Sequence, residues 1–212
     1  MTQYGFYVNT DICIGCKACM TSCFDRNDLE VPQKFRTVFE FGGGAWETDA
    51  DGAFINTVFC YYVSVTCGQC ESPSCVEACP TDAMRKDPET GIVDNDKGAC
   101  VGCMSCEAAC PYGHPARMAD GLSHKCVMCA DLAEGGVPDP TCVKACPVRA
   151  IEFGPIEDLR AAHGEVDALG ELTNETGPNV VFNPHRSSGR GGALMNPAEI
   201  GHGANGKRPQ RE

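Results

Sequence analysis

Sixteen of the 17 cysteines in this 212-residue chain fall into four compact groups of four. In chain order the groups are Cys13, Cys16, Cys19 and Cys23; Cys67, Cys70, Cys75 and Cys79; Cys100, Cys103, Cys106 and Cys110; and Cys126, Cys129, Cys142 and Cys146. Each group begins as Cys-x-x-Cys and ends as Cys-x-x-x-Cys. A proline follows the last cysteine in three groups, whereas Phe24 follows it in the first. Internal repetition of this kind sets the architecture of a chain, so it is the first constraint on the fold.

The spacing of the cysteines discriminates between three kinds of thiol chemistry. Disulfides between cysteines so close in sequence are strained, and an odd total argues against a disulfide framework. Structural zinc sites use two Cys-x-x-Cys pairs separated by a dozen or more residues, an arrangement that only the last group approaches. The compact form ending in Cys-Pro is typical of bacterial ferredoxins, in which three thiolates bind one [4Fe–4S] cluster and the fourth binds another. Since such motifs act in pairs, the sequence predicts four [4Fe–4S] clusters.

The acidic charge of the chain bears on its cofactors and limits its expected partners. The formal net charge is −12, and four oxidised clusters with their thiolates would add roughly −8. Backbone N–H groups and the nearby Lys17, Lys97, Lys125 and Lys144 are expected to offset part of this charge and to tune reduction potentials. The alternative for each lysine is a solvated surface charge. Nucleic acid is not an expected partner, because there is no basic stripe to neutralise phosphates.

No membrane span or export signal of its own is expected. The longest apolar run, residues 59–65, is far shorter than the roughly 20 residues that cross a bilayer. The N-terminus lacks a charged region, an apolar region and a twin arginine. A chain of this kind would leave the cytoplasm only with a partner.

The segments between the motifs predict an α+β fold. Residues 34–41 and 53–65 read as two strands joined by a Gly-rich turn, which gives a long hairpin between the first two motifs. Residues 83–94 predict a short hairpin between paired motifs, and residues 150–165 predict a strand followed by an amphipathic helix. Cys60 lies in the second arm of the long hairpin, where we expect a buried packing or interface residue rather than a reactive thiol.

Two further features concern function. From about residue 171 the chain is rich in Gly, Pro, Asn and Arg, which predicts a tail that is too Gly-rich for a core and either is mobile or, preferably, lies along a partner. No Ser–His–Asp order, carboxylate pair, P-loop or dinucleotide fingerprint is evident. The sequence therefore predicts electron transfer without catalysis.

The pattern as a whole resembles the iron–sulfur (B) subunits of anaerobic dimethyl sulfoxide reductase-like molybdopterin oxidoreductases, a family of four-cluster electron-transfer subunits. The resemblance is carried by QYGFYVNTDICIGCKAC, FCYYVSVTCGQCESPSC, CPYGHP, HKCVMCADLAEG and CPVRAIEFGPIEDLRAAHG. It implies two bacterial-ferredoxin-like lobes, each with two [4Fe–4S] clusters. The implied boundaries are 1–59 and 124–170 for the first lobe, with a hairpin insertion at about 34–65; 60–123 for the second lobe; and 171–212 for an extended partner-binding tail.

The resemblance also implies the ligands of each cluster. The sets are Cys13, Cys16, Cys19 and Cys146; Cys23, Cys126, Cys129 and Cys142; Cys67, Cys70, Cys75 and Cys110; and Cys79, Cys100, Cys103 and Cys106. In the related nitrate reductase subunit a tryptophan at the position of Cys103 leaves a three-iron cluster. The cysteine here is therefore expected to complete a fourth [4Fe–4S] cluster.

The function that the resemblance implies is a relay of electrons between a quinol-oxidising membrane anchor, or another carrier, and a molybdopterin (bis-MGD) catalytic subunit. The expected location is peripheral, at the extracytoplasmic face of the cytoplasmic membrane after export with a twin-arginine partner, or alternatively the cytoplasm. Two alternatives remain open. One is a soluble polyferredoxin-like carrier, and the other is the same relay in a soluble molybdenum enzyme such as a dehydroxylase, hydroxytransferase, arsenate reductase or polysulfide reductase.

Overall fold

The computed structural model describes residues 2–133, 135–165, 169, 172 and 174–200, and it is built from short helices and strands. In chain order they are β1 (Tyr4–Asn9), α1 (Ala18–Arg26), β2 (Arg36–Gly43), β3 (Trp46–Thr48), β4 (Phe54–Asn56), β5 (Phe59–Thr66), α2 (Ser74–Glu77), β6 (Met84–Lys86), β7 (Val93–Asn95), α3 (Ser105–Ala109), β8 (Ala116–Arg117), β9 (Ser123–His124), the 3-10 helix η1 (Ala130–Leu132), α4 (Thr141–Lys144), β10 (Ile151–Pro155), α5 (Ile156–His163), β11 (Val180–Asn183), β12 (Ala193–Leu194) and α6 (Pro197–Ile200). This mixture of helices and strands agrees with the predicted α+β class.

The largest core surrounds a three-stranded sheet with the order β10-β1-β11. β1 pairs antiparallel with β10, with Phe6 opposite Phe153, and parallel with β11, with Phe6 opposite Val180. Nearly every residue of β1 is buried, because α5 covers one face through Ile156 and Leu159 while the main core covers the other. The predicted strand and helix at 150–165 are confirmed as β10 and α5.

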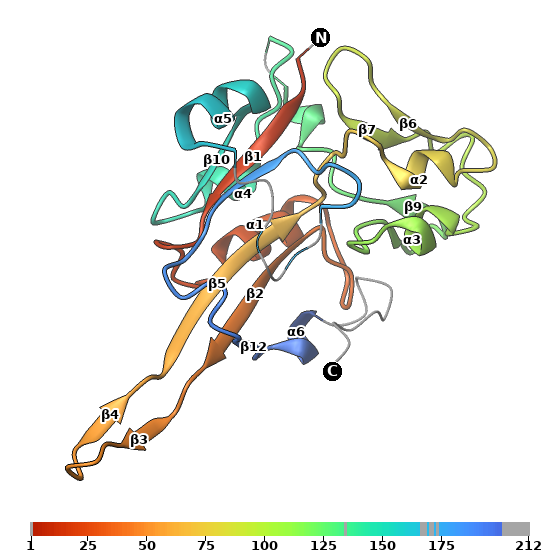
Figure 1. Ribbon diagram of the computed structural model, residues 1–212. Helices are drawn as coiled ribbons and strands as arrows, with labels where there is room; N and C mark the ends of the chain where they lie inside the picture. The colour runs from red at the N-terminus through yellow and green to blue at the C-terminus, as the bar shows by residue number, and fades with distance from the viewer. Residues whose placement is uncertain (1, 134, 166–168, 170–171, 173, 201–212) are drawn as a thin grey trace.

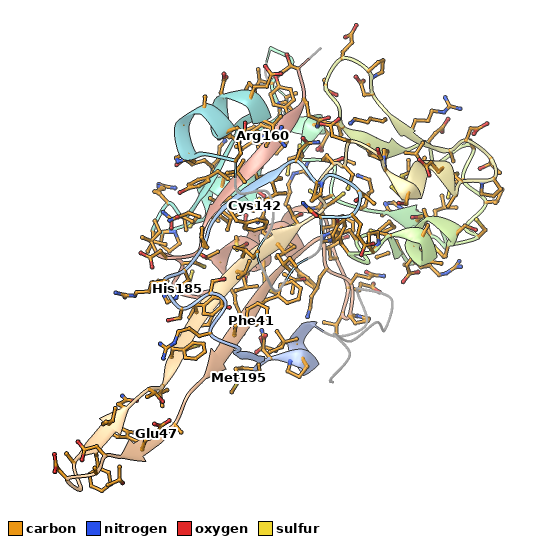
Figure 2. The ribbon with its side chains drawn as sticks, viewed as in Figure 1. Phe41, Glu47, Cys142, Arg160, His185 and Met195 are labelled. Atoms are coloured by element: carbon orange, nitrogen blue, oxygen red, sulfur yellow. The ribbon has the colours of Figure 1, made fainter. Side chains whose placement is uncertain are left out.

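A long hairpin leaves this core and extends away from the rest of the protein (Figure 1). β2 and β5 pair antiparallel along their whole length, from Arg36 opposite Thr66 to Gly43 opposite Phe59, and β3 and β4 continue the hairpin outward. Glu47 marks its outer part and Phe41 its inner part (Figure 2). The predicted hairpin between the first two motifs is therefore confirmed.

The helices that follow the cysteine loops pack in two pairs. α1, from the first motif, contacts α4, from the last, whereas α2 contacts α3. The strands β6 and β7, which confirm the hairpin predicted at 83–94, lie with α2, α3 and β9 on one side of the molecule in Figure 1. Elements that are adjacent in space thus combine the first motif with the fourth and the second motif with the third.

The prediction that the C-terminal segment is too Gly-rich for a core is wrong for residues 179–182. Asn179, Val180, Val181 and Phe182 are buried, because this short apolar run supplies the third strand beside β1. Farther on, β12 pairs with β2, and Asn196 exchanges hydrogen bonds with the backbone of Val38 and Glu40. Residues 171, 173 and 201–212 of the predicted tail lie outside the described residues.

Candidate metal centres

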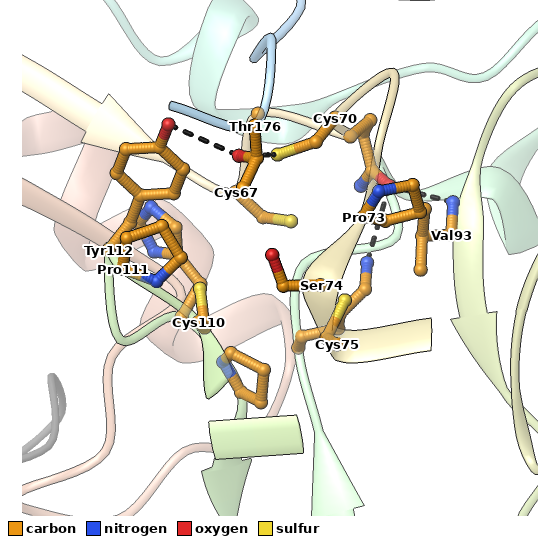
Figure 3. A pocket seen from close by; sticks show the side chains of 15 residues that line it. Cys67, Cys70, Pro73, Ser74, Cys75, Val93, Cys110, Pro111, Tyr112 and Thr176 are labelled. Carbon is orange, nitrogen blue, oxygen red and sulfur yellow. Dashed lines mark hydrogen bonds between the residues drawn. The ribbon is translucent and has the colours of Figure 1, made fainter. Parts of the chain in front are cut away.

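Three cavities are each lined by four cysteines drawn from two different motifs. The first cavity is bordered by Cys67, Cys70, Cys75 and Cys110, as Figure 3 shows. The second is bordered by Cys13, Cys16, Cys19 and Cys146, and the third is bordered by Cys23, Cys126, Cys129 and Cys142. In every case three thiols come from one motif and one thiol comes from the motif whose helix packs against it.

The remaining four cysteines also lie in one region, but they are more exposed. Cys106 is buried in a small core with Met84 and Val93, and Cys79 packs against the same core. Cys103 is exposed and Cys100 is half-buried. Ser105 lowers the pKa of Cys103 and a charge on Cys79 opposes this, whereas burial raises the pKa of Cys106 and a charge on Cys100 adds to the rise, so these thiols lie close enough to interact.

The four cysteine motifs share one backbone feature. The residue before the second cysteine of each Cys-x-x-Cys pair has a left-handed conformation in all four motifs: Gly15, Gln69, Gly102 and Met128 have φ between 48° and 66°. Non-glycine residues rarely adopt this conformation, and it persists mainly where a functional site requires it. Tight turns that contain a left-handed residue direct successive N–H groups into one concavity, which suits an anionic group such as an iron–sulfur cluster.

Hydrogen-bond donors are directed at several of the sulfur atoms. The backbone N–H groups of Ala150 and Met128 donate to the sulfurs of Cys146 and Cys126 at 3.2 and 3.4 Å. The Thr176 Oγ1 lies 3.0 Å from Cys70 Sγ, and the Ser123 Oγ lies 3.1 Å from Cys106 Sγ. Donors in these positions stabilise thiolates, the form in which cysteine binds metals.

The thiols differ in how readily they lose a proton on their own. Burial raises the pKa of Cys70 to about 11 and that of Cys75 to about 12. The Ser105 hydroxyl and backbone N–H lower the pKa of the exposed Cys103 thiol. The buried thiols of Cys70 and Cys75 become thiolates only when a cation compensates for the lost hydration, as iron does when it binds.

The arrangement fits a polynuclear cofactor better than a single ion. Around one zinc ion the Zn–S bond of ~2.3 Å would bring the sulfurs to within roughly 4 Å of one another. Among the residues that the structure describes, no three His, Cys, Asp or Glu side chains converge closely enough to hold one ion. Four soft thiol ligands around a cavity match the one-ligand-per-iron requirement of a [4Fe–4S] cluster.

Two of the four lysines that the sequence suggested line the cavities: Lys17 borders the cavity of Cys13, and Lys125 borders the cavity of Cys67. Lys17 and Lys144 form ion pairs with Glu199 and Asp139, and the Lys144 side chain is 66% exposed. Lys125 is buried, and its ammonium donates to the carbonyl oxygen of Cys126 at 2.8 Å. Lys97 is partly buried, which lowers its pKa, and it donates to the Ser123 carbonyl at 2.9 Å. The tuning role of these lysines stays a prediction.

The sequence did not point to Arg36, the most deeply buried cation among the described residues. Its side chain is 2% exposed at the start of β2 and lines the cavity of Cys23, Cys126, Cys129 and Cys142. Burial lowers its pKa, but the nearby thiols, Cys142 first, raise it by more. The sequence contains a signal for the burial of Arg36. Arg36 and Val38 are two residues apart in a strand, so their side chains lie on the same face, which is the buried one.

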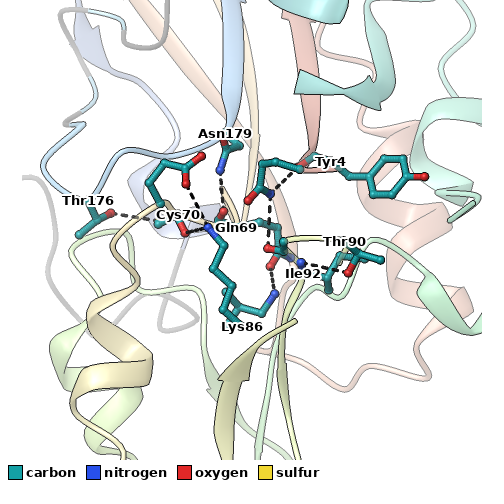
Figure 4. A network of polar contacts seen from close by, with 12 residues as sticks. Tyr4, Gln69, Cys70, Lys86, Thr90, Ile92, Thr176 and Asn179 are labelled. Atoms are coloured by element: carbon teal, nitrogen blue, oxygen red, sulfur yellow. Dashed lines mark hydrogen bonds and ion pairs between the residues drawn. The ribbon is translucent and has the colours of Figure 1, made fainter. Parts of the chain in front are cut away.

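A polar network joins the second motif to the fourth. Gln69 is fully buried; its Nε2 donates to the Cys126 carbonyl at 2.8 Å, and its Oε1 accepts from the Val93 N–H at 2.7 Å. The Asn179 amide donates to the Gln69 carbonyl oxygen at 2.8 Å (Figure 4). The loop of one cavity is thereby fixed directly against the loop of another.

Cys60, the cysteine outside the four groups, is exposed in β5, with its sulfur 4.0 Å from Glu40 Oε1. Burial of Cys60 within this protein, one of the two options expected from the sequence, is therefore wrong, because β5 at this point already belongs to the projecting hairpin. An interface role stays a prediction.

No helix within the described ranges has the length and apolarity needed to cross a bilayer.

Comparison with known proteins agrees with the thiol pattern. Residues 58–156 match the model of the 4Fe-4S dicluster domain family. The sequence is 42% identical to the B subunit of anaerobic dimethyl sulfoxide reductase from Escherichia coli (strain K12) over 207 residues, which cover 94% of this sequence and 99% of that protein. It is 39% identical to the B subunit of the same enzyme from Haemophilus influenzae, over 94% of this sequence and 100% of that protein. It is 35% identical to the hydrogenase-2 operon protein HybA of Escherichia coli O157:H7, over 74% of this sequence and 53% of that protein. The chain therefore belongs to the family of iron–sulfur electron-transfer subunits that includes the B subunit of anaerobic dimethyl sulfoxide reductase.

Proposed function

We propose that this protein holds four [4Fe–4S] clusters and relays electrons along them to or from a molybdopterin catalytic subunit. The proposed ligand sets are Cys13, Cys16, Cys19 and Cys146; Cys23, Cys126, Cys129 and Cys142; Cys67, Cys70, Cys75 and Cys110; and Cys79, Cys100, Cys103 and Cys106. The observation that carries the proposal is the lining of the three cavities, where the thiols of two motifs meet as in paired ferredoxin motifs. The equivalent left-handed turn at Gly102 supports a fourth site of the same kind.

The paired packing of the helices supports two ferredoxin-like lobes. α1 with α4, and α2 with α3, bring the first motif to the fourth and the second to the third. The contact between Gln69 and Cys126 keeps the cavity of Cys67 beside the cavity of Cys126. A cluster in each cavity would accept and pass on one electron at a time, and the surrounding protein would hold the cavities at fixed separations.

The names of the relatives suggest the partners. The relatives in Escherichia coli and Haemophilus influenzae are named as components of dimethyl sulfoxide reductases. We infer a bis-MGD catalytic subunit, which would supply the chemistry on the substrate, and a membrane anchor that oxidises quinol. The corresponding location is the membrane surface, on the extracytoplasmic side if a twin-arginine partner exports the complex.

The projecting hairpin supplies a surface for the large partner. Trp46, Phe54, Ile55 and Val58 are 45–78% exposed on the outer part of the hairpin. Exposed apolar groups gathered on one projection are typical of protein–protein interaction sites. We assign this arm to the catalytic subunit, because a relay subunit must be held at a fixed distance from the site that it supplies.

Anoxic purification from the native host tests the proposal. The expected result is about 16 iron atoms per protein molecule, four per [4Fe–4S] cluster, together with molybdenum and a large co-purifying subunit identified by mass spectrometry. Iron in this amount on a protein without partners would instead support a soluble ferredoxin-like carrier. A colourless zinc protein would refute both alternatives.

A pair of cysteine variants tests the fourth ligand set. Replacing Cys103 with serine is expected to convert one cluster into a three-iron centre that is visible by electron paramagnetic resonance (EPR) in the oxidised protein. Cys60→Ser is the matched control, because Cys60 is also exposed but lies outside every group. An unchanged spectrum for Cys103→Ser would contradict the assignment.

A further inference from the structure

Arg36 carries a buried charge that has no acidic partner in the described part of the protein. Its Nη1 donates to Ser64 Oγ at 2.9 Å, and its guanidinium carbon lies 4.8 Å from the centre of the Phe6 ring. Its Nε and Nη2 are buried and make no hydrogen bond of ordinary geometry among the described residues, although the guanidinium lies close enough to the Cys142 thiol to oppose the rise that burial causes in the pKa of that thiol. Nor does any described carboxylate form an ion pair with Arg36. A buried cation without compensating charge is strongly unfavourable, so this arrangement calls for an anion at the site.

The surroundings of Arg36 identify where that anion lies. Arg36 lines the cavity of Cys23, Cys126, Cys129 and Cys142. Its partner Ser64 lines the neighbouring cavity of Cys13, Cys16, Cys19 and Cys146, with Ser64 Oγ 3.4 Å from Cys19 Sγ. One guanidinium and its hydroxyl partner therefore stand between two rings of thiols.

We propose that Arg36 is the shared counter-charge of the two clusters bound by the first and fourth motifs, and that its free Nε–H and Nη2–H groups donate hydrogen bonds to sulfur at the cavity of Cys23. The proposal rests on the proposed function, since it requires clusters in these two cavities. It goes beyond that function by assigning the control of two potentials to one residue. Arg36 acts on the clusters without exchanging electrons, so it is a positioning and tuning residue.

The sign of the effect follows from charge. A [4Fe–4S] cluster with four thiolates carries about −2 when oxidised and about −3 when one electron has entered, with no bond formed or broken. A fixed positive charge and hydrogen bonds to sulfur favour the more negative form, so they raise the reduction potential. Because arginine keeps its proton at all accessible pH values, Arg36 exerts this effect without taking up or releasing a proton.

The test is a redox titration of the cluster-loaded protein followed by EPR. The signals of the two clusters are first identified by their change in Cys16→Ser and Cys129→Ser variants. Replacing Arg36 with methionine is expected to lower the potentials of these two clusters by at least a tenfold change in the reduction equilibrium, which is 59 mV for one electron. The other two potentials are expected to stay within experimental error of the unmodified protein. Arg36→Lys, which keeps the charge but loses the planar fork, is expected to give a smaller shift.

Arg190→Met is the matched control, since Arg190 also stacks on a phenylalanine, with its guanidinium carbon 4.6 Å from the Phe59 ring centre, but is exposed. It is expected to leave all four potentials unchanged. Should Arg36→Met lose iron, Arg36→Gln is measured as well; loss confined to the two clusters supports the proposal, whereas loss spread over all four overturns it. Wild-type potentials in fully loaded Arg36→Met also overturn it. Absence of four clusters in the unmodified protein would refute the proposed function itself, which keeps the two failures distinct.

Discussion

Gln69 Nε2 donates a hydrogen bond to the carbonyl oxygen of Cys126 over 2.8 Å, and this contact joins two cysteine motifs through residues that are 57 positions apart in sequence. The same side chain accepts from the Val93 N–H and lies 3.3 Å from the Lys125 ammonium. A single buried amide thus satisfies the polar groups at the junction of two cavities. Its removal would leave several of them without a partner.

We therefore expect Gln69→Leu to destabilise the cluster-loaded protein. Each buried donor or acceptor left unsatisfied costs about 1–3 kcal/mol of unfolding free energy. Anoxic guanidinium unfolding measures the effect. Gln33→Leu is the control, since the side chain of Gln33 makes its two hydrogen bonds, to the Arg117 carbonyl and from the Glu30 N–H, at the exposed surface, and a change within about 0.5 kcal/mol is expected there. Equal losses for the two variants would contradict the role of the junction.

The glycines with left-handed backbone conformation lead to a second prediction. Gly15 has φ of 66°, and a Cβ at this position would overlap the Tyr62 ring; Gly52 has φ of 81° with open space around it. Alanine in the left-handed conformation costs about 1–2 kcal/mol at either position. Only Gly15→Ala is expected to lose iron as well, because the displaced loop carries Cys13 and Cys16.

Adding Tyr62→Ala to Gly15→Ala separates the two contributions. The double variant is expected to recover iron content, measured colorimetrically, because the ring no longer occupies the space that the new methyl group needs. If Gly15→Ala and Gly52→Ala retain equal iron, the loop does not depend on the close approach of Tyr62.

Removal of iron is expected to destabilise the central core. Cys19, Cys142 and Cys146 belong to the same buried cluster as Phe6, Val8 and Ile151, so emptying their cavities removes packing from the core itself. Metal binding of this kind is coupled to folding. Anoxic chelation should therefore lower the thermal midpoint and weaken the near-ultraviolet circular dichroism; an unchanged midpoint would show that the protein folds without its clusters.

A feature of the fold or of the site was predictable from the sequence where its pattern lies within one continuous segment. The long hairpin, the hairpin at 83–94 and the strand and helix at 150–165 were predictable, since each has a continuous pattern and its own turn. Strand register could have placed Arg36 on the buried face, but the roles of Arg36 and Gln69 were not predictable, because they arise from contacts across the fold with residues such as Cys142 and Cys126. The strand at 180–183 was missed because three apolar residues are too few to stand out in a Gly-rich segment.

That strand gives a fourth prediction. Phe182 is 5% exposed beside β1, and truncation of a buried phenylalanine typically costs 3–5 kcal/mol. We expect Phe182→Ala to lower the unfolding free energy by about this amount. Phe54→Ala is the control because Phe54 is 78% exposed, and it should change stability by less than about 0.5 kcal/mol. Similar values for both would place residues 180–183 outside the folding unit.

The projecting hairpin gives the last prediction. Trp46 and Phe54 are 67% and 78% exposed, and β3 and β4 pair only with each other. Replacing both with serine should leave iron content and stability unchanged, because neither side chain contributes to a core. It should reduce the amount of the large subunit that co-purifies with the tagged protein by about tenfold or more, as expected when aromatic anchors of an interface are removed. Val31→Ser, which changes another apolar residue that is 87% exposed but lies outside the strands of the hairpin, should retain the partner. Co-purification that survives the double variant would move the partner interface to another surface of the protein.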